Sequence, residues 1–205
     1  MLVLFEGMPG SGKTTQMREV KHALEKLGHA VLVPNTKNKF IRQLERVIKQ
    51  RKLSFVSPLR ELILWKIKEL QDANLRSVVA RTPRDTIILF DSHGGRSVAY
   101  SQCTLKEYRF GKEMWGPFFQ KFLQGDLTIF LAVDHQTAKR RKPHAPTVRV
   151  PGFFREVERN YRKLAKEHRW HVIDTAKHSR EETARIIMER ILAALKTAHS
   201  GKAKK

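Results

Sequence analysis

A glycine-rich loop between a short apolar run and an amphipathic stretch constrains this chain more than any other feature. The loop, Gly7-Met8-Pro9-Gly10-Ser11-Gly12-Lys13-Thr14, matches the pattern G-x-x-x-x-G-K-[ST] in full. Leu2–Phe5 before it is typical of a buried strand, and Lys13–Leu27 after it has the apolar spacing of a helix. Because a phosphate-binding loop needs this strand–loop–helix order, the sequence predicts one here.

The residue types of the loop suit a bound triphosphate. Glycines reach backbone angles that other residues avoid, which lets successive N–H groups point at phosphate oxygens. The N-terminus of the following helix adds a partial positive charge. We therefore expect a triphosphate as the ligand, Lys13 on its β- and γ-phosphates, and the Thr14 hydroxyl on Mg²⁺. The predicted nucleotide-binding residues are Gly7, Gly10, Ser11, Gly12, Lys13, Thr14 and Thr15.

Short apolar runs alternate with amphipathic stretches along the whole chain. Strands are predicted at Leu2–Phe5, Ala30–Val33, Thr86–Phe90, Leu127–Val133 and His171–Ile173. Helices are predicted at Lys13–Leu27, Arg60–Val79, Lys106–Leu123, Gly152–His168 and Arg180–Thr197. The alternation indicates a three-layer α/β fold, a parallel sheet with helices on both faces. Because the 205 residues contain no Pro-, Ser- or Gly-rich linker, we expect one domain over residues 1–198 and a basic tail at 199–205.

An acidic residue ends the third predicted strand. Asp91 follows Ile87–Phe90, at the edge of the sheet where ligands bind in α/β proteins. Two functional roles suit it, holding Mg²⁺ through water or accepting a proton from an attacking hydroxyl. A turn or helix-capping role is the alternative. We favour a functional role because the phosphate loop brings the chemistry to the same edge.

Composition excludes several other classes of protein. Cys103 is the single cysteine, so a disulfide within the chain and a cysteine-based zinc site are both excluded. No apolar run reaches the length of about 18 residues that suggests a transmembrane helix. The N-terminus lacks the basic region and cleavage site of a signal peptide. We therefore expect a cytoplasmic protein without a membrane partner.

Motifs along nearly the whole chain resemble those of the thymidylate kinase family. The resemblance is carried by Phe5-Glu6-Gly7 with Gly10–Gln16, Asp91 with Ala99-Tyr100, Gly125–Leu131, Val150–Phe154, Tyr161–Ala165 and Val172–Asp174. It implies a P-loop NTPase fold with a five-stranded parallel sheet, ATP and Mg²⁺ as cofactors, and a short basic lid at residues 139–150. It also implies that lid arginines close over the transferred phosphoryl group, and Arg140, Arg141 and Arg149 are equal candidates. By the same analogy we expect a homodimer formed through the long helices.

The acceptor half of the site departs from the family's pattern. Pro9 stands where the family has an acid that contacts the acceptor sugar, and Ser92 where it has an arginine that holds the acceptor phosphate. Lys68 or Glu69 stands near an arginine expected on the long third helix. Gly94-Gly95 either lets the backbone approach a ligand closely or forms a surface turn. The predicted acceptor-binding residues are Ser92, His93, Arg96, Tyr100 and Arg60.

The basic excess is concentrated in two segments. The formal net charge is +21, which predicts an anionic partner. Residues 37–52 hold seven Lys or Arg against one Glu, and residues 139–169 hold eleven against three. In this fold both segments would flank the acceptor side of the cleft. ATP alone does not call for such a surface, whereas a polynucleotide gains affinity with each phosphate that is neutralised.

Together these observations predict an ATP- and Mg²⁺-dependent kinase with a nucleotide-type acceptor. The charge and the missing clamps favour a hydroxyl within DNA or RNA, either a 5′-OH or a hydroxymethyl on a pyrimidine base, with Asp91 as the general base. The alternative is a divergent nucleoside monophosphate kinase, acting on a dTMP-like acceptor, that uses other arginines. A nucleic-acid-binding module that uses ATP only as a switch is a third interpretation, which the intact Gly12-Lys13-Thr14 with Asp91 argues against.

Overall fold

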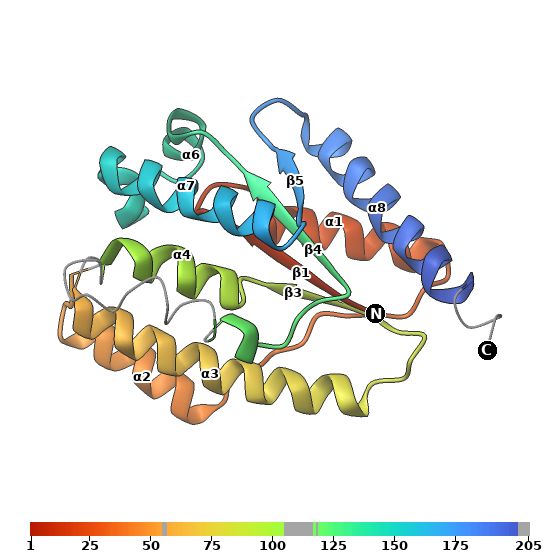
Figure 1. Cartoon of the computed structure of the whole chain (residues 1–205), viewed down its shortest axis with the longest axis horizontal. Coiled ribbons are helices and arrows are strands. Elements are labelled where there is room, and N and C mark those ends of the chain that lie inside the picture. Colours follow the sequence, from red (N-terminus) through yellow and green to blue (C-terminus); the bar gives the residue numbers. More distant parts are fainter. Residues whose placement is uncertain (55–56, 105–116, 118, 201–205) are drawn as a thin grey trace.

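A five-stranded parallel sheet forms the centre of the protein, in the order β2-β3-β1-β4-β5 (Figure 1). The computed structural model describes residues 1–54, 57–104, 117 and 119–200. The strands span Leu2–Gly7 (β1), Val31–Leu32 (β2), Ile87–Asp91 (β3), Leu127–Ala132 (β4) and His171–Asp174 (β5). All five predicted strands are present, so the predicted α/β sheet is confirmed.

Helices cover both faces of this sheet. They span Lys13–Lys26 (α1), Lys39–Gln50 (α2), Pro58–Arg81 (α3), Gly94–Thr104 (α4), His135–Arg141 (α6), Pro151–Glu167 (α7) and Arg180–Ser200 (α8), with a 3₁₀ turn at Pro146–Arg149 (η2). Four predicted helices are therefore confirmed as α1, α3, α7 and α8. The fifth, Lys106–Leu123, lies mostly outside the described residues, as does most of the predicted tail. Helices α2 and α4 were not predicted.

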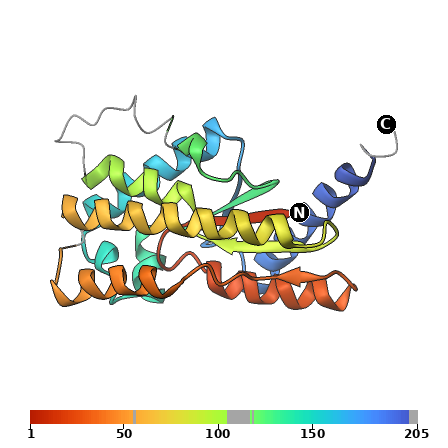
Figure 2. The ribbon, with the colours of Figure 1, turned by 90° about the horizontal axis from the view of Figure 1, so that it is seen from below.

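The apolar residues of the sheet alternate between two cores. Val3 and Phe5 of β1 pack with α1 and α8 in one buried cluster, whereas Leu2 and Leu4 pack with Leu75 of α3 in another. This alternation follows from the two-residue period of a strand. A third cluster joins α4 and α7, and includes Trp65 of α3. Figures 1 and 2 show the two helical layers on either side of the strands.

The parallel register brings the carboxyl ends of β1 and β3 together. Phe5 is paired with Asp91, so the phosphate loop after β1 and the acidic end of β3 share one edge of the sheet. Residues 139–150, predicted to be a lid, form the end of α6 and the turn η2 at the same end of the molecule (Figure 1). In the described part of the chain, every helix is too short or too polar to cross a bilayer.

The position of Gly94-Gly95 contradicts one of the two interpretations made from the sequence, the surface turn. The two glycines are buried and form the first residues of α4, so they do not make a surface turn. A Cβ atom on Gly95 would lie 2.6 Å from the Trp170 ring and 3.0 Å from the Glu6 carboxyl carbon. The pair is therefore needed because α4 packs closely on β1 and on the segment before β5.

The close packing at Gly95 predicts a specific loss of stability. We expect Gly95→Ala to lower the free energy of unfolding by about 1–3 kcal/mol, because the added methyl overpacks the core. Gly152→Ala is the matched control, since a Cβ there meets nothing within 4 Å and alanine favours a helix by about 1 kcal/mol. Urea unfolding followed by circular dichroism measures both changes. Equal effects of the two substitutions would contradict the packing argument.

Candidate active site

The phosphate loop has the backbone geometry that a bound triphosphate requires. Gly10 and Gly12 have φ angles of 85° and 88°, in the left-handed region that favours glycine. A Cβ on Gly10 would also lie 2.9 Å from the Cα atom of Ala138, so α6 packs directly on the loop. Helix α1 starts at Lys13 without a side-chain cap. Its first N–H groups and partial positive charge therefore suit phosphate oxygens.

Lys13 folds back over the loop that precedes it. Its ammonium donates to the carbonyl oxygens of Gly7 at 2.8 Å and Met8 at 3.2 Å. Burial lowers the pKa of Lys13, and the carboxylates of Asp91 and Glu6 oppose that shift. The ammonium is thus held at the mouth of the loop, close to negative charge. A γ-phosphate is the kind of group that such a cation stabilises.

Thr14 and Asp91 face each other across the edge of the sheet. The Thr14 hydroxyl donates to Asp91 Oδ2 at 3.5 Å, and the Ser92 hydroxyl donates to Asp91 Oδ1 at 2.8 Å. Ser11 Oγ is buried and has no hydrogen-bond partner among the described residues. Within the same part of the chain, no group of three His, Cys, Asp or Glu side chains could hold a metal. Mg²⁺ commonly binds through one or two protein oxygens plus phosphate oxygens and water, so this pair fits Mg²⁺ in company with ATP.

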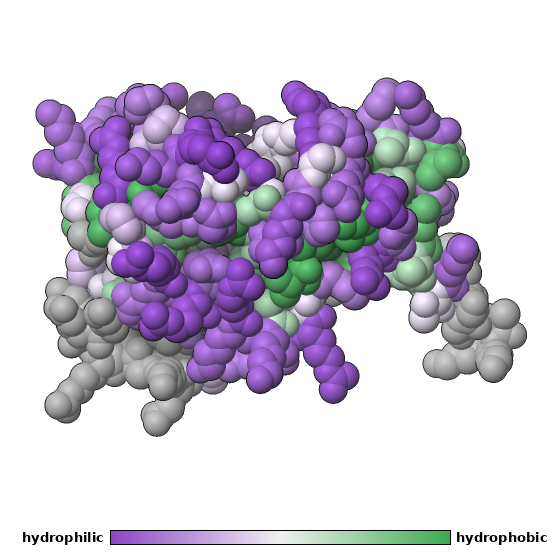
Figure 3. Space-filling view, turned by 90° about the horizontal axis from the view of Figure 1, so that it is seen from above, coloured by the Kyte–Doolittle hydropathy of each residue, from purple (hydrophilic) through white to green (hydrophobic). Residues whose placement is uncertain are grey.

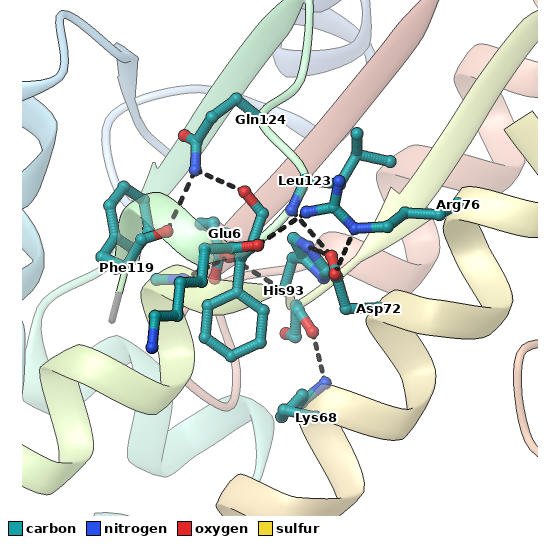
Figure 4. Close-up of polar contacts among 12 residues, drawn as sticks. Glu6, Lys68, Asp72, Arg76, His93, Phe119, Leu123 and Gln124 are labelled. Atoms are coloured by element: carbon teal, nitrogen blue, oxygen red, sulfur yellow. Dashed lines mark hydrogen bonds and ion pairs between the residues drawn. The ribbon is translucent and has the colours of Figure 1, made fainter. Parts of the chain in front are cut away.

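A buried carboxylate fixes the turn between β3 and α4 (Figure 4). Glu6 Oε1 accepts from the backbone N–H groups of His93 at 2.8 Å and Gly95 at 3.1 Å, and Glu6 Oε2 accepts from the Tyr161 hydroxyl at 3.4 Å. Burial raises the pKa of Glu6, while the nearby His93 and Lys68 oppose that shift. Glu6 therefore caps α4 from the central strand.

Helix α3 holds the same turn from the other side. The Lys68 ammonium donates to the carbonyl oxygen of Ser92, and Asp72 Oδ1 pairs with His93 Nε2 at 2.8 Å. Asp72 is itself held by the Arg76 guanidinium and the Leu123 N–H, each at 2.7 Å. Burial, followed by the charge of Arg96, lowers the pKa of Lys68 to about 8. Figure 4 shows these contacts converging on the turn from α3.

Arg96 is the centre of a group of cations beside the phosphate loop. Burial is the main cause that lowers the pKa values of Lys13, Lys68 and Arg60, and the charge of Arg96 lowers each of them further. The guanidinium lies 4.5 Å from the centroid of the Tyr100 ring, one turn along α4. Its buried Nη1 is 3.5 Å from Glu61 Oε1 but makes no hydrogen bond to a described residue. Several cations with an unused buried N–H group form an arrangement that suits an anion.

The three arginines of the predicted lid differ in their contacts. Arg141 donates to the Gly10 carbonyl oxygen at 3.3 Å, the Thr175 hydroxyl at 3.0 Å and the Thr175 carbonyl oxygen at 2.7 Å. Arg140 donates to the Thr137 hydroxyl at 3.1 Å, within its own helix. Arg149 is exposed and has no hydrogen bond or ion pair to a described residue. Arg141 thus ties α6 to the loop, while Arg140 and Arg149 are less constrained.

The other residues predicted to contact the acceptor have mixed positions. The structure brings Arg96, Tyr100 and Arg60 together, although Tyr100 is only 5% exposed and lies beneath Arg96. His93 is 1% exposed and its ring is used by Asp72, so its contacts are with the protein itself. Lys68 and Glu61 were missing from the predicted site. The position of Lys68, near that of an arginine expected on the long helix, was the signal that pointed to it.

Comparisons with known proteins agree on one family. The family model described as Thymidylate kinase matches residues 5–187. The probable thymidylate kinase of Methanocaldococcus jannaschii is 27% identical, covering 89% of this chain and 90% of that protein. The probable thymidylate kinase of Methanosphaera stadtmanae is 29% identical over 81% and 84% of the two chains. The thymidylate kinase of Acholeplasma laidlawii is 27% identical over 95% of this chain and its own full length.

The contacts of Arg141 predict that it stabilises the folded phosphate loop. We expect Arg141→Gln to lower the free energy of unfolding by about 1–2 kcal/mol, since it removes charged hydrogen bonds to Gly10 and Thr175. Arg140→Gln, which removes one contact inside α6, is the matched control and should change stability by less than about 0.5 kcal/mol. Thermal unfolding of both variants measures the difference. An unchanged midpoint for Arg141→Gln would contradict this role.

Proposed function

Because the chain belongs to the thymidylate kinase family and is therefore an ATP-dependent phosphotransferase that uses Mg²⁺, we propose that it phosphorylates a nucleoside monophosphate. Thymidylate is the first acceptor to test, since the relatives are named for it. The proposal rests above all on Arg96, whose buried Nη1 lacks a hydrogen-bond partner among the described residues and lies among other cations. An acceptor phosphate would add negative charge and a hydrogen-bond acceptor beside Arg96, where Glu61 Oε1 lies 3.5 Å from Nη1 without forming a hydrogen bond.

The donor side of the proposed reaction uses the loop and its two flanking strands. The loop N–H groups and Lys13 hold the phosphates of ATP and stabilise charge on the transferring group. Thr14 and Asp91 would hold Mg²⁺, which would supply positive charge to neutralise the phosphates. Gly7, Gly10, Ser11, Gly12 and Thr15 complete the nucleotide-binding loop. A monophosphate acceptor attacks through an oxygen that is already ionised, so no proton needs to be removed and Asp91 serves the metal.

On the acceptor side, the positive charge for the acceptor phosphate comes from helices α3 and α4 and not from the turn after β3. Position 92 is a serine whose φ is 54° and whose carbonyl oxygen accepts from Lys68. Its side chain is bonded to Asp91, so it has neither the reach nor the charge to clamp a phosphate. Arg96 on α4, with Lys68 and Arg60 on α3, supplies that charge instead. Ser92 then acts by fixing the Asp91 carboxylate.

The lid contributes cations that are free to move onto the transferring group. Arg149 and Arg140 have fewer contacts than Arg141, so they are the better candidates for closing over the γ-phosphate. Arg141 positions the loop. A homodimer belongs to the same proposal, since the large apolar side chains of Phe40, Leu59 and Leu62 on α2 and α3 are more than half exposed.

A monophosphate acceptor is better supported than a hydroxyl within DNA or RNA. The charge and the missing clamps favoured the polynucleotide from the sequence, but the relatives are thymidylate kinases and the cations around Arg96 provide an alternative clamp. No contact among the described residues favours a polynucleotide acceptor. The basic excess therefore needs an explanation apart from the acceptor.

Labelled ATP with a panel of acceptors tests the proposed activity. We expect transfer to one or more of dTMP, dUMP, dCMP, dAMP and dGMP, and none to DNA or hydroxymethyl-containing DNA. Arg96→Gln should raise the acceptor KM about 10- to 100-fold, the effect of losing a charged hydrogen bond, and leave ATP binding unchanged. Arg84→Gln, at an exposed position beyond α3, is the control. Label found only on DNA would refute the proposal.

The pKa of Lys68 predicts a pH dependence of acceptor binding. The ammonium loses its proton as the pH rises through about 8, so attraction to the phosphate is present below that pH and is lost above it. The acceptor KM should therefore rise several-fold between pH 7 and about pH 9.5, because each unit above the pKa lowers the charged fraction about tenfold.

The variant Lys68→Arg tests whether Lys68, and not another titrating group, causes the pH dependence of the acceptor KM. Arginine stays charged over the whole range, so the acceptor KM of this variant should be flat between the same two pH values. Lys66→Arg is the matched control, since Lys66 is exposed on the same helix. A pH dependence that persists in Lys68→Arg would assign it to another residue.

A further inference from the structure

Helix α7 carries a row of basic side chains on the face opposite the core. Its buried side is formed by Phe154, Val157, Tyr161, Leu164 and Ala165. Arg155, Arg159, Arg162 and Lys166 are all exposed. Their spacing of four, three and four residues places them on one side of a helix, where they form a row about 16 Å long at a rise of about 1.5 Å per residue. We call these four residues the α7 row.

Most of this charge is not neutralised by neighbouring carboxylates. Arg162 pairs with Glu158 at 2.6 Å. For Arg155, Arg159 and Lys166 no ion pair to a residue in the described ranges is found. The sequence contains no Asp or Glu between Asp134 and Glu156. In the α6 and η2 region that packs against α7, every charged side chain is therefore basic. Figure 3, seen from the side on which α7 lies in Figure 1, shows mostly hydrophilic residues over this part of the surface.

The proposed reaction does not use the α7 row. The side of α7 that packs on α4 and β4 is its apolar side, and the row lies on the other. Nucleotide and acceptor are served by Lys13, Arg96, Lys68 and the lid. A row of exposed cations with few partners is expected to bind an extended anion, because each cation then meets a phosphate and releases a counterion.

We propose that the α7 row is a docking surface for the phosphate backbone of double-stranded DNA, separate from the kinase site. A lipid surface fits less well, since membrane-surface helices insert an apolar face and the apolar face of α7 is buried in the core. Single strands are bound largely by stacking on aromatic side chains. In the row, all four side chains are basic, and the aromatic residues Phe154 and Tyr161 are buried. A rigid helix with cations every 4.5–6 Å, or about one turn apart, suits a stiff and regular phosphate row.

The surface requires no particular base sequence. Contacts to phosphates position a protein on DNA but carry no sequence information. The proposal therefore predicts non-specific, salt-sensitive binding. It does not rest on the proposed acceptor, because a kinase of any small acceptor can carry this surface.

Fluorescence anisotropy with a labelled 20-base-pair DNA tests the proposal in the full chain. The triple variant Arg155→Gln/Arg159→Gln/Lys166→Gln should bind at least tenfold more weakly than the unchanged protein. The negative slope of log K against log salt should become shallower by about 2 to 3, since each phosphate contact contributes about −0.9 to it. The triple variant Lys26→Gln/Arg84→Gln/Arg190→Gln removes the same charge from exposed positions on α1, after α3 and on α8, and should bind less than threefold more weakly.

Two further measurements make the outcome decisive. Both triple variants should keep the turnover of the unchanged protein with its nucleotide acceptor, which separates docking from catalysis. Single-stranded DNA, duplex RNA and vesicles with about 30% phosphatidylserine serve as competitors, and each should compete less well than duplex DNA. Equal losses in the two triple variants, or stronger competition by RNA, single strands or vesicles, would overturn the proposal.

Discussion

The buried carboxylate of Glu6 joins the two halves of the site. It lies on the central strand, one residue before the phosphate loop, and accepts the backbone N–H groups that begin α4. A buried carboxylate without such partners is costly, and a helix start without a cap leaves donors unsatisfied. Each therefore stabilises the other. Because the contact joins β1 to the β3–α4 turn, the loop and Arg96 have a defined relative position.

The same turn is constrained by charges on α3. Lys68 and Asp72 lie one helical turn apart, and they hold the Ser92 carbonyl oxygen and the His93 ring. Ser92 itself has a left-handed φ of 54°, an uncommon conformation for a residue with a side chain. Contacts from Glu6, Lys68 and Asp72 stabilise that conformation. The result is an Asp91 carboxylate fixed between Ser92 and Thr14.

The donor half could be predicted from the sequence because its geometry is local. The glycines, Lys13 and Thr14 lie within eight consecutive residues, and the strands that flank them have clear apolar patterns. Helix α4 could not be predicted in that way. It begins with two glycines, which are poor helix formers, and its cap comes from Glu6, 88 residues before Gly94. Helix α2 had a local signal, since Asn38 caps Ile41 at 2.9 Å, but its many charges obscured the apolar stripe.

The position of the proposed acceptor clamp is consistent with the energetic cost of placing an arginine at each of two positions. At position 92, the backbone carbonyl oxygen already accepts a hydrogen bond from Lys68, and the side chain is bonded to the Asp91 carboxylate. An arginine side chain there would lose the second of these contacts. At position 96 the guanidinium stacks on Tyr100 and faces Glu61, which offset part of the cost of burying its charge. Its Nη1 lies 3.5 Å from Glu61 Oε1 but makes no hydrogen bond to a described residue. Since an unsatisfied buried donor costs about 1–3 kcal/mol, a phosphate that binds there gains both the electrostatic attraction and the relief of that cost.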